Sequence, residues 1–265
     1  MSLRFTILGC GSSGGVPRVA QGWGACDPNE PKNTRRRCSA LIERIGAGGK
    51  TIALVDLSPD LRWQLIDAEI ARLDGVLLTH PHADHTHGID DLRPLTIASR
   101  RRIDIYMDAL TSREVTTKFG YIFATPQGSS YPPIAREHRL TAGAAVELTG
   151  PGGAISATPF AVEHGDIPAL GYRIGGLAYT PDLSGVPDAA WRYLEGLDVW
   201  VIDALRYSPH PSHLSLDEAL ALIERMAPKR AVLTNLHTDL DYTTLARRLP
   251  PRVTPAFDGM CIEGF

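Results

Sequence analysis

The chain has 265 residues, of which 43% are hydrophobic and 22% are charged, and its formal net charge is −3. This length suits one large domain, and the small negative charge excludes a general electrostatic attraction to nucleic acid or membranes. No apolar run approaches the roughly 18 residues of a membrane span, and the N-terminus lacks a signal-peptide pattern. The sequence therefore predicts one cytoplasmic domain over residues 1–265, with no membrane partner.

The first elements in chain order are strands separated by loops rich in glycine or arginine. Residues 4–9 are predicted to form a strand that ends in a glycine-rich segment, 9–17. That segment resembles a nucleotide-binding loop only weakly, because no helical pattern follows it. We expect a tight turn beside the functional site, with backbone N–H groups available to an anion.

The strongest positive cluster follows this turn, at Asn33, Arg35, Arg36 and Arg37. Two interpretations stay open: a solvated basic loop, or a set of side chains that binds a substrate phosphate through bidentate arginine contacts. Four cysteines are widely spread and form no C-x-x-C pair, which predicts reduced thiols rather than a disulfide framework. They are Cys10, Cys26, Cys38 and Cys261.

The central and C-terminal regions alternate strands with helices. The segment 119–133 is an irregular stretch rich in aromatic residues and proline, which predicts either a flap over the site or a surface loop. Apolar positions at helical spacing predict a helix over 216–226. Further predicted strands cover 39–45, 51–56, 75–78, 103–107, 146–148, 155–162, 171–174, 177–180, 230–235 and 253–262, and further helices cover 58–66, 111–118 and 191–194.

The most informative stretch is the cluster of histidines that follows the strand 75–78. His80 and His82 project to the same side of an extended segment, and Asp84 and His85 start a second group after the turn. Neutral imidazoles with carboxylates suit Zn, Mn or Fe rather than Ca or Mg. Two such groups side by side would hold two metals about 3.5–4 Å apart, as in two-metal hydrolases.

A two-metal site needs further ligands downstream, and three candidates each follow a strand-like run: His164, Asp182 and His237. Alone, each histidine would more often be an ordinary hydrogen-bonded residue. Asp56 ends a buried-looking strand, where an unpaired carboxylate is costly, so a metal-bound histidine N–H is its expected partner.

The pattern His80-x-His82-x-Asp84-His85 resembles the metal-binding signature of the metallo-β-lactamase superfamily. This resemblance implies an α+β fold, the αββα sandwich of two mixed β-sheets flanked by helices. It implies that Asp182 bridges two divalent transition metals, Zn or Mn with Fe as a third option. It divides the remaining ligands into His80, His82 and His164 for one metal and Asp84, His85 and His237 for the other, and leaves His87 outside the set.

His213 precedes the predicted helix 216–226, with Ser212 or Ser215 as the candidate N-cap. Its context, His-Leu-Ser-Leu-Asp-Glu, resembles the phosphodiesterase branch of the superfamily, which includes tRNA 3′-processing ribonucleases and a cyclic ribose-phosphate phosphodiesterase. Segments 9–17 and 257–260 resemble the latter group as well. That group can carry a structural zinc on three closely spaced cysteines and a late histidine. The cysteine spacing here predicts no such zinc.

The leading hypothesis is hydrolysis of a small phosphodiester by a metal-bridging hydroxide, with His213 as general acid and Asp84 as the second catalytic residue. Asn33 and the three arginines would hold the phosphate. Alternatives are RNA 3′ processing, acyl hydrolysis by a thioesterase, lactonase or β-lactamase-like enzyme, and a binding protein with a relic site. No stable nucleic-acid partner is expected, because no Lys/Arg-rich insertion is present. A homodimer is left open.

Overall fold

The structure is a computed structural model that describes residues 2–265. Two seven-stranded sheets form its centre, with the strand orders β14-β1-β2-β3-β4-β5-β6 and β13-β12-β11-β10-β9-β8-β7. The first sheet consists of β1 (Ser2–Gly9), β2 (Ser39–Gly46), β3 (Gly49–Val55), β4 (Gly75–Leu77), β5 (Ile103–Met107), β6 (Ala135–Arg139) and β14 (Cys261–Glu263). The second consists of β7 (Val146–Leu148), β8 (Ile155–His164), β9 (Ile167–Ile174), β10 (Leu177–Thr180), β11 (Val199–Asp203), β12 (Arg230–Thr234) and β13 (Val253–Pro255).

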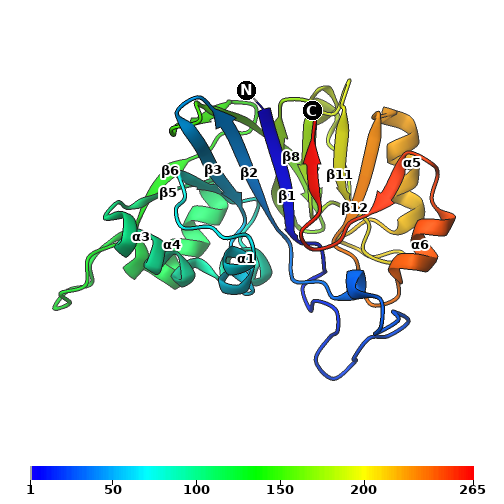
Figure 1. Ribbon diagram of the computed structural model, residues 1–265, viewed down its shortest axis with the longest axis horizontal. Coiled ribbons are helices and arrows are strands. Elements are labelled where there is room, and N and C mark those ends of the chain that lie inside the picture. The colour runs from blue at the N-terminus through cyan, green and yellow to red at the C-terminus, as the bar shows by residue number, and fades with distance from the viewer. Residues whose placement is uncertain (1) are drawn as a thin grey trace.

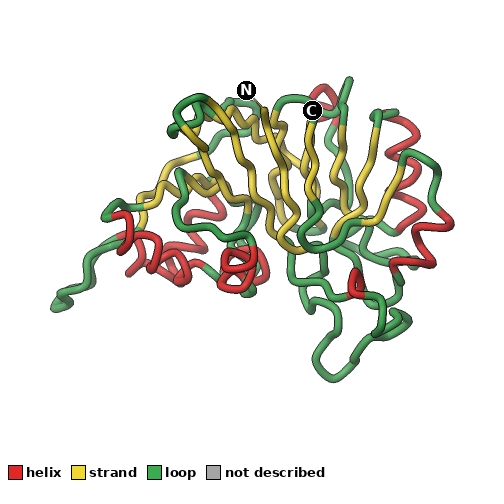
Figure 2. Tube along the Cα trace, in the orientation of Figure 1, coloured by secondary structure: helices red, strands yellow, loops and turns green. Residues whose placement is uncertain are grey.

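Helices cover the outer face of each sheet, which confirms the predicted αββα arrangement (Figures 1 and 2). The first sheet carries α1 (Leu61–Asp67), α2 (Ala83–Thr86), α3 (Arg93–Ser99) and α4 (Ala109–Phe123). The second sheet carries α5 (Leu216–Met226) and α6 (Tyr242–Arg248). Short 3-10 turns lie at η1 (Pro31–Asn33), η2 (Ile89–Leu92) and η3 (Asp188–Tyr193). None of the helices in residues 2–265 has the length and apolarity that crossing a membrane requires.

The apolar core divides into three layers that follow from strand alternation and helix amphipathicity. Side chains such as Phe5, Tyr172 and Tyr179 fill the space between the sheets and are fully buried. A second cluster packs the other face of the second sheet against Ile223 of α5 and Leu245 of α6. A third packs the first sheet against α1, α3 and α4. Both faces of each sheet are therefore covered, as a sandwich of this kind requires.

The topology brings several strand ends to one edge of the sandwich. β3, β4 and β5 run parallel in the first sheet, and β10, β11 and β12 run parallel in the second. Parallel strands have their carboxyl ends at the same edge, so the loops that follow them gather there. Figure 1 shows the long N-terminal loop between β1 and β2 at this edge, opposite the two chain ends.

Three predicted elements differ from the structure. The expected strand 253–262 is two strands, β13 in the second sheet and β14 in the first, because the chain crosses from one sheet to the other. The expected helix 191–194 is the 3-10 turn η3. The candidate flap 119–133 is partly helical, since α4 extends to Phe123 before an irregular segment begins. By contrast, Ser215, one of the two predicted N-cap candidates, is the N-cap of α5 and forms a reciprocal capping box with Glu218.

Arg35 holds the loop between β1 and β2 in place. Its side chain is only 2% exposed. The guanidinium donates to the carbonyl oxygens of Leu240 at 2.7 Å and His237 at 3.2 Å, and to Asn33 Oδ1 at 3.1 Å. It also lies 3.9 Å from the Cys26 sulfur. A buried arginine thus ties this loop to the segment that follows β12.

We expect the substitution Arg35→Ala to lower the free energy of unfolding by about 2–4 kcal/mol, because it leaves buried carbonyl oxygens without donors. Chemical denaturation monitored by circular dichroism measures this change. Arg247→Ala, an exposed arginine of α6, is the matched control and should stay within about 0.5 kcal/mol of the parent. Equal stability of the two variants would contradict this account of the loop.

Candidate metal centre

A cavity of about 260 Å³ opens at the edge where the strand ends meet. Histidine, aspartate and arginine side chains dominate its wall. The lining residues are Ser12, Ser13, Arg18, His82, Asp84, His164, Asp182, Leu205, Arg206, His210, Ser212, His213 and His237. The cavity is therefore strongly polar, in contrast to the apolar layers of the protein core.

The first group of potential ligands contains His80, His82, His164 and Asp182. β4 delivers His80 and His82 through the turn before α2, and His164 is the last residue of β8. Nδ1 of His82 lies 3.0 Å from Nε2 of His80 and 3.2 Å from Nε2 of His164. Three imidazoles from two sheets therefore converge on one point.

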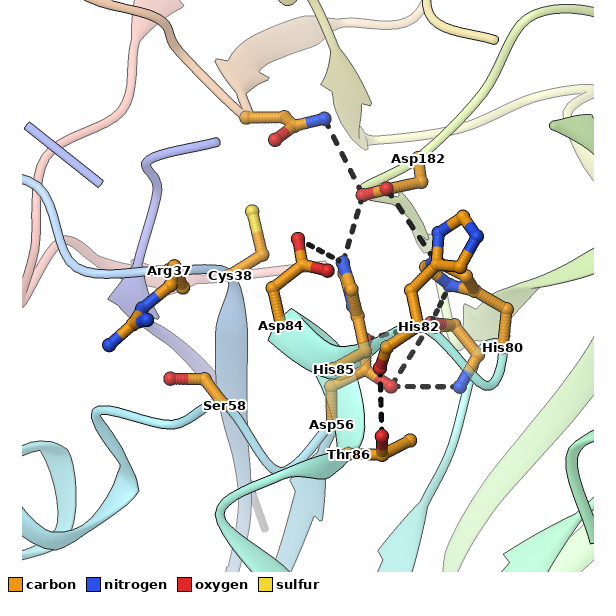
Figure 3. Close-up of polar contacts among 12 residues, drawn as sticks. Arg37, Cys38, Asp56, Ser58, His80, His82, Asp84, His85, Thr86 and Asp182 are labelled. Atoms are coloured by element: carbon orange, nitrogen blue, oxygen red, sulfur yellow. Dashed lines mark hydrogen bonds and ion pairs between the residues drawn. The ribbon is translucent and has the colours of Figure 1, made fainter. Parts of the chain in front are cut away.

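The second group contains Asp84, His85 and Asp182, so the Asp182 carboxylate belongs to both groups. Nε2 of His85 lies 3.2 Å from Asp182 Oδ1 and 3.5 Å from Asp84 Oδ2. The other Asp182 oxygen lies 3.6 Å from Nε2 of both His80 and His164. Figure 3 shows Asp182 above the histidines, facing both groups. This position suits a carboxylate that is shared by two metal ions.

Hydrogen bonds on the far side of the ring orient three of the four imidazoles in the two ligand groups. Nδ1 of His85 lies 2.7 Å from Asp56 Oδ2, and Nδ1 of His164 lies 2.7 Å from the carbonyl oxygen of Ser212. The hydroxyl of Thr79 contacts Nδ1 of His80 at 2.9 Å. Metal-binding histidines commonly donate their second ring N–H in this way, which fixes the tautomer and the ring direction.

Asp56 is the residue that links these orienting contacts. It is fully buried, and its oxygens accept hydrogen bonds from the backbone N–H of Thr79 at 2.8 Å and from the Thr79 hydroxyl. Its φ of +64° turns the chain immediately after β3. Aspartate adopts this left-handed conformation more readily than most residues. Asp56 therefore hydrogen-bonds to His85, a histidine of the second ligand group.

The protonation states of the three imidazoles in the first group favour metal binding. Burial lowers the pKa of His80, His82 and His164, so these imidazoles are neutral near pH 7 and offer lone pairs. Burial alone would raise the pKa of Asp182, but the charge of His85 and its interaction with the carboxylate hold that pKa well below its usual range. The shared carboxylate is therefore ionised.

The donor set fits divalent transition metals. The ring nitrogens of the first group are separated by 3.0 and 3.2 Å, close to the edge of about 3.3 Å expected for a tetrahedral site with metal–nitrogen bonds near 2.05 Å. Nε2 of His85 is buried without any hydrogen-bond partner, although it faces two carboxylates. An imidazole nitrogen in this position suits a metal ligand.

His213 lies at the cavity wall beside the first group. Its Nδ1 lies 2.9 Å from Asp203 Oδ2 and 3.1 Å from the side-chain amide of Asn235, and its Nε2 lies 4.0 Å from Asp182 Oδ2. Burial lowers the pKa of His213, but the hydrogen bond and the charge of Asp203 outweigh burial, so the pKa is raised. The ring is thus oriented by a buried carboxylate, with Nε2 directed to the cavity.

His237 lines the cavity but lies outside both ligand groups. Its Nε2 is 2.5 Å from a guanidinium nitrogen of Arg18, and its Nδ1 is 3.3 Å from Asp239 Oδ1. His87 also lies outside both groups, exposed and packed edge-on against Phe119. Assignment of His237 to the second metal therefore stays a prediction.

The predicted phosphate-binding cluster does not line the cavity that the structure describes. Asn33 and Arg35 are buried, and the two terminal nitrogens of the Arg35 guanidinium make the contacts within the chain described above. Arg36 pairs with Asp67 at 2.6 Å, and Arg37 pairs with Asp60 at 2.6 Å. In Figure 3 the Arg37 side chain points away from the histidines. These four residues therefore bind other parts of the chain.

The positive charges that do line the cavity are Arg18 and Arg206. Neither was among the predicted site residues. Arg18 directly follows the glycine-rich segment 9–17, and Arg206 precedes His213 in the loop after β11. Their closeness in sequence to two predicted site segments was the signal that could have identified them. His210 lines the same wall, with its ring centroid 5.1 Å from that of His213.

This largely buried cluster of histidines and aspartates at the strand ends of an αββα sandwich could hold divalent metal ions. The family model of the β-lactamase superfamily domain matches residues 51–235, and the chain belongs to this superfamily. A solved structure described as a new diphosphatase from the PhnP family is 34% identical, with a TM-score of 0.89 over 100% of this chain and 98% of that chain. The short form of human tRNase Z, 19% identical with a TM-score of 0.63 over 98% of each chain, shares the fold.

Curated relatives have other names and greater lengths. An octanoyltransferase of Porphyromonas gingivalis is 32% identical over 97% of this chain and 51% of its own length. A ribonuclease Z of a Bradyrhizobium species is 33% identical over 54% of this chain and 45% of its own length. The chain thus spans about half the length of the first of these proteins.

We expect Asp56→Asn to weaken metal binding by about 10- to 100-fold, because it removes the carboxylate that orients His85. Asparagine suits the positive φ at this position, so the backbone should be retained. Titration with Zn²⁺ or Mn²⁺ against a competing chelator measures the affinity. Asp60→Asn, which removes the partner of Arg37 away from the ligand groups, is the control. Equal affinities in the two variants would show that Asp56 does not support the metal site.

Proposed function

We propose that this protein is a dinuclear metal-dependent phosphodiesterase for small phosphodiesters, such as a cyclic ribose phosphate or a nucleotide-like compound. The observation that carries the proposal is the position of His213. An oriented imidazole that belongs to neither ligand group faces the cavity beside the shared carboxylate. Phosphodiester cleavage needs such a group, because the departing alkoxide must gain a proton.

The charge of the cavity wall supports an anionic substrate. Arg18 and Arg206 add two permanent positive charges beside His210 and His213. Guanidinium groups bind phosphate through paired N–H donors. A neutral acyl substrate has no charged group for these arginines to bind. The similarity to a diphosphatase at 34% identity over the whole chain points to the same phosphoryl chemistry.

The ligand residues would divide between two ions. His80, His82 and His164 would hold the first, Asp84, His85 and His237 would hold the second, and Asp182 would be shared by both. Two bound divalent ions would lower the pKa of a shared water and neutralise charge that develops on the phosphoryl oxygens. Asp84 lines the cavity, where its carboxylate would lie beside a bound phosphoryl group.

His213 then supplies the proton. Its raised pKa favours the protonated ring, and Asp203 Oδ2 lies 2.9 Å from Nδ1, where it orients the imidazole. Transfer of the Nε2 proton to the leaving oxygen would complete the cleavage. The small volume of the cavity, about 260 Å³, suits a mononucleotide-sized diester rather than the body of an RNA.

Acyl thioester hydrolysis is the second candidate. It is favoured by one observation, the 32% identity to a protein named octanoyltransferase over 97% of this chain. A panel of bis-p-nitrophenyl phosphate, a ribonucleoside 2′,3′-cyclic phosphate, an octanoyl thioester and a lactam separates the candidates. Turnover of the diesters with no turnover of the thioester supports the proposal, and the reverse result would replace it.

We expect His213→Ala to reduce kcat for a phosphodiester by about 100-fold or more, since the general acid is lost. Metal content should stay at the wild-type value, because His213 belongs to neither ligand group. Steady-state kinetics together with elemental analysis measure both quantities. Loss of metal in this variant would instead identify His213 as a ligand.

We expect the purified wild-type protein to bind two equivalents of Zn²⁺ or Mn²⁺, and Asp182→Ala to weaken both binding steps, because one carboxylate faces both groups. Calorimetric titration of the metal-free protein measures the stoichiometry. A single equivalent in the wild-type protein would contradict a dinuclear centre.

A further inference from the structure

Arg18 occupies the imidazole nitrogen that His237 would offer to the second metal ion. A guanidinium nitrogen of Arg18 lies 2.5 Å from Nε2 of His237. Nδ1 of the same ring lies 3.3 Å from Asp239 Oδ1, which places the ring proton on Nδ1 and the lone pair on Nε2. Arginine is a donor only, so its N–H must point at that lone pair. A metal ion on His237 requires the same lone pair.

We propose that Arg18 exchanges His237 for the substrate: when a metal ion takes Nε2 of His237, the guanidinium is released into the cavity and binds an anionic phosphoryl oxygen of the diester. The inference rests on the proposed function, because it takes His237 as a ligand of the second metal. It adds a substrate-binding role for Arg18 and couples that role to metal occupancy.

The cavity wall already contains a partner for such an oxygen. Ser12 lines the same cavity as Arg18, is only 3% exposed, and its hydroxyl is buried without a hydrogen-bond partner. A buried hydroxyl without a partner costs free energy unless a ligand or water satisfies it. A phosphoryl oxygen between Ser12 and the released Arg18 would satisfy both groups.

The second arginine of the wall behaves differently. The guanidinium of Arg206 donates to the carbonyl oxygens of Ser208 at 3.1 Å and Pro209 at 2.7 Å, within its own loop. No metal ligand of the two groups contacts it. These hydrogen bonds fix Arg206 in place. Arg18 instead has one hydrogen bond within the cavity, to Nε2 of His237, and a metal ion on that nitrogen would break it.

Gly14 allows the present position of Arg18. A Cβ atom at Gly14 would collide with Nε and the terminal atoms of the Arg18 side chain. Gly14 is not among the glycines with positive φ, so alanine fits its backbone. Gly14→Ala should therefore push the guanidinium off His237 while keeping its charge in the loop. The variant separates the hydrogen bond to His237 from the charge of Arg18.

The experiment titrates the metal-free protein with Mn²⁺ by calorimetry, and then titrates the Mn²⁺-saturated protein with inorganic phosphate. We expect Arg18→Ala and Gly14→Ala to bind the second Mn²⁺ about two- to tenfold more tightly, because the competing hydrogen bond is lost. Phosphate should bind about tenfold more weakly to Arg18→Ala and as tightly as wild type to Gly14→Ala. Arg247→Ala, an exposed arginine of α6, should match wild type in both titrations.

His237→Ala distinguishes failure of this inference from failure of its basis. If His237→Ala weakens the second Mn²⁺ step but Arg18→Ala leaves it unchanged, the exchange is refuted and the dinuclear proposal stands. If His237→Ala leaves both Mn²⁺ steps unchanged, His237 is no ligand and the inference falls with that assignment. Equal phosphate affinity of Arg18→Ala and wild type would refute the substrate-binding role of Arg18.

Discussion

The buried carboxylate of Asp182 is the constraint on which the rest of the site depends. It lies within 3.6 Å of ring nitrogens from three histidines that come from both sheets. A charge and several unsatisfied lone pairs in a buried position are costly, and a divalent cation is the group that offsets this cost for all of them together. The orienting bonds to Asp56, Thr79 and the Ser212 carbonyl oxygen keep the lone pairs directed at one point.

The same local device supports the site from each sheet. Asp56 follows β3 and Asn235 follows β12, and both residues have positive φ, +64° and +61°. Each turns its chain sharply at the strand end, so that its side chain faces the site rather than solvent. Asp56 then orients His85, while Asn235 donates to Asp203 at 3.2 Å and thereby fixes the carboxylate that holds His213. The orientations of His85 and His213 thus depend on two strand ends with the same backbone conformation.

How much the sequence predicted depended on the range of each interaction. The group around His80 was predictable because its spacing is local, and His164 and Asp182 because each ends a strand-like run. The role of Arg35 could not be predicted, because its carbonyl partners at His237 and Leu240 lie more than 200 residues away in the sequence. The density of positive charge alone therefore predicted phosphate binding by residues 35–37. The arginines that line the cavity are instead Arg18 and Arg206. The crossing of residues 253–262 between the sheets was equally invisible, because both halves have strand propensity.

That crossing also ties the two halves of the candidate site together. The chain passes from one sheet to the other between β6 and β7 and again between β13 and β14. The first ligand group takes His80 and His82 from the end of β4 in one sheet and His164 from the end of β8 in the other. Two covalent connections across the sandwich therefore limit how far the two parts of this group can move apart.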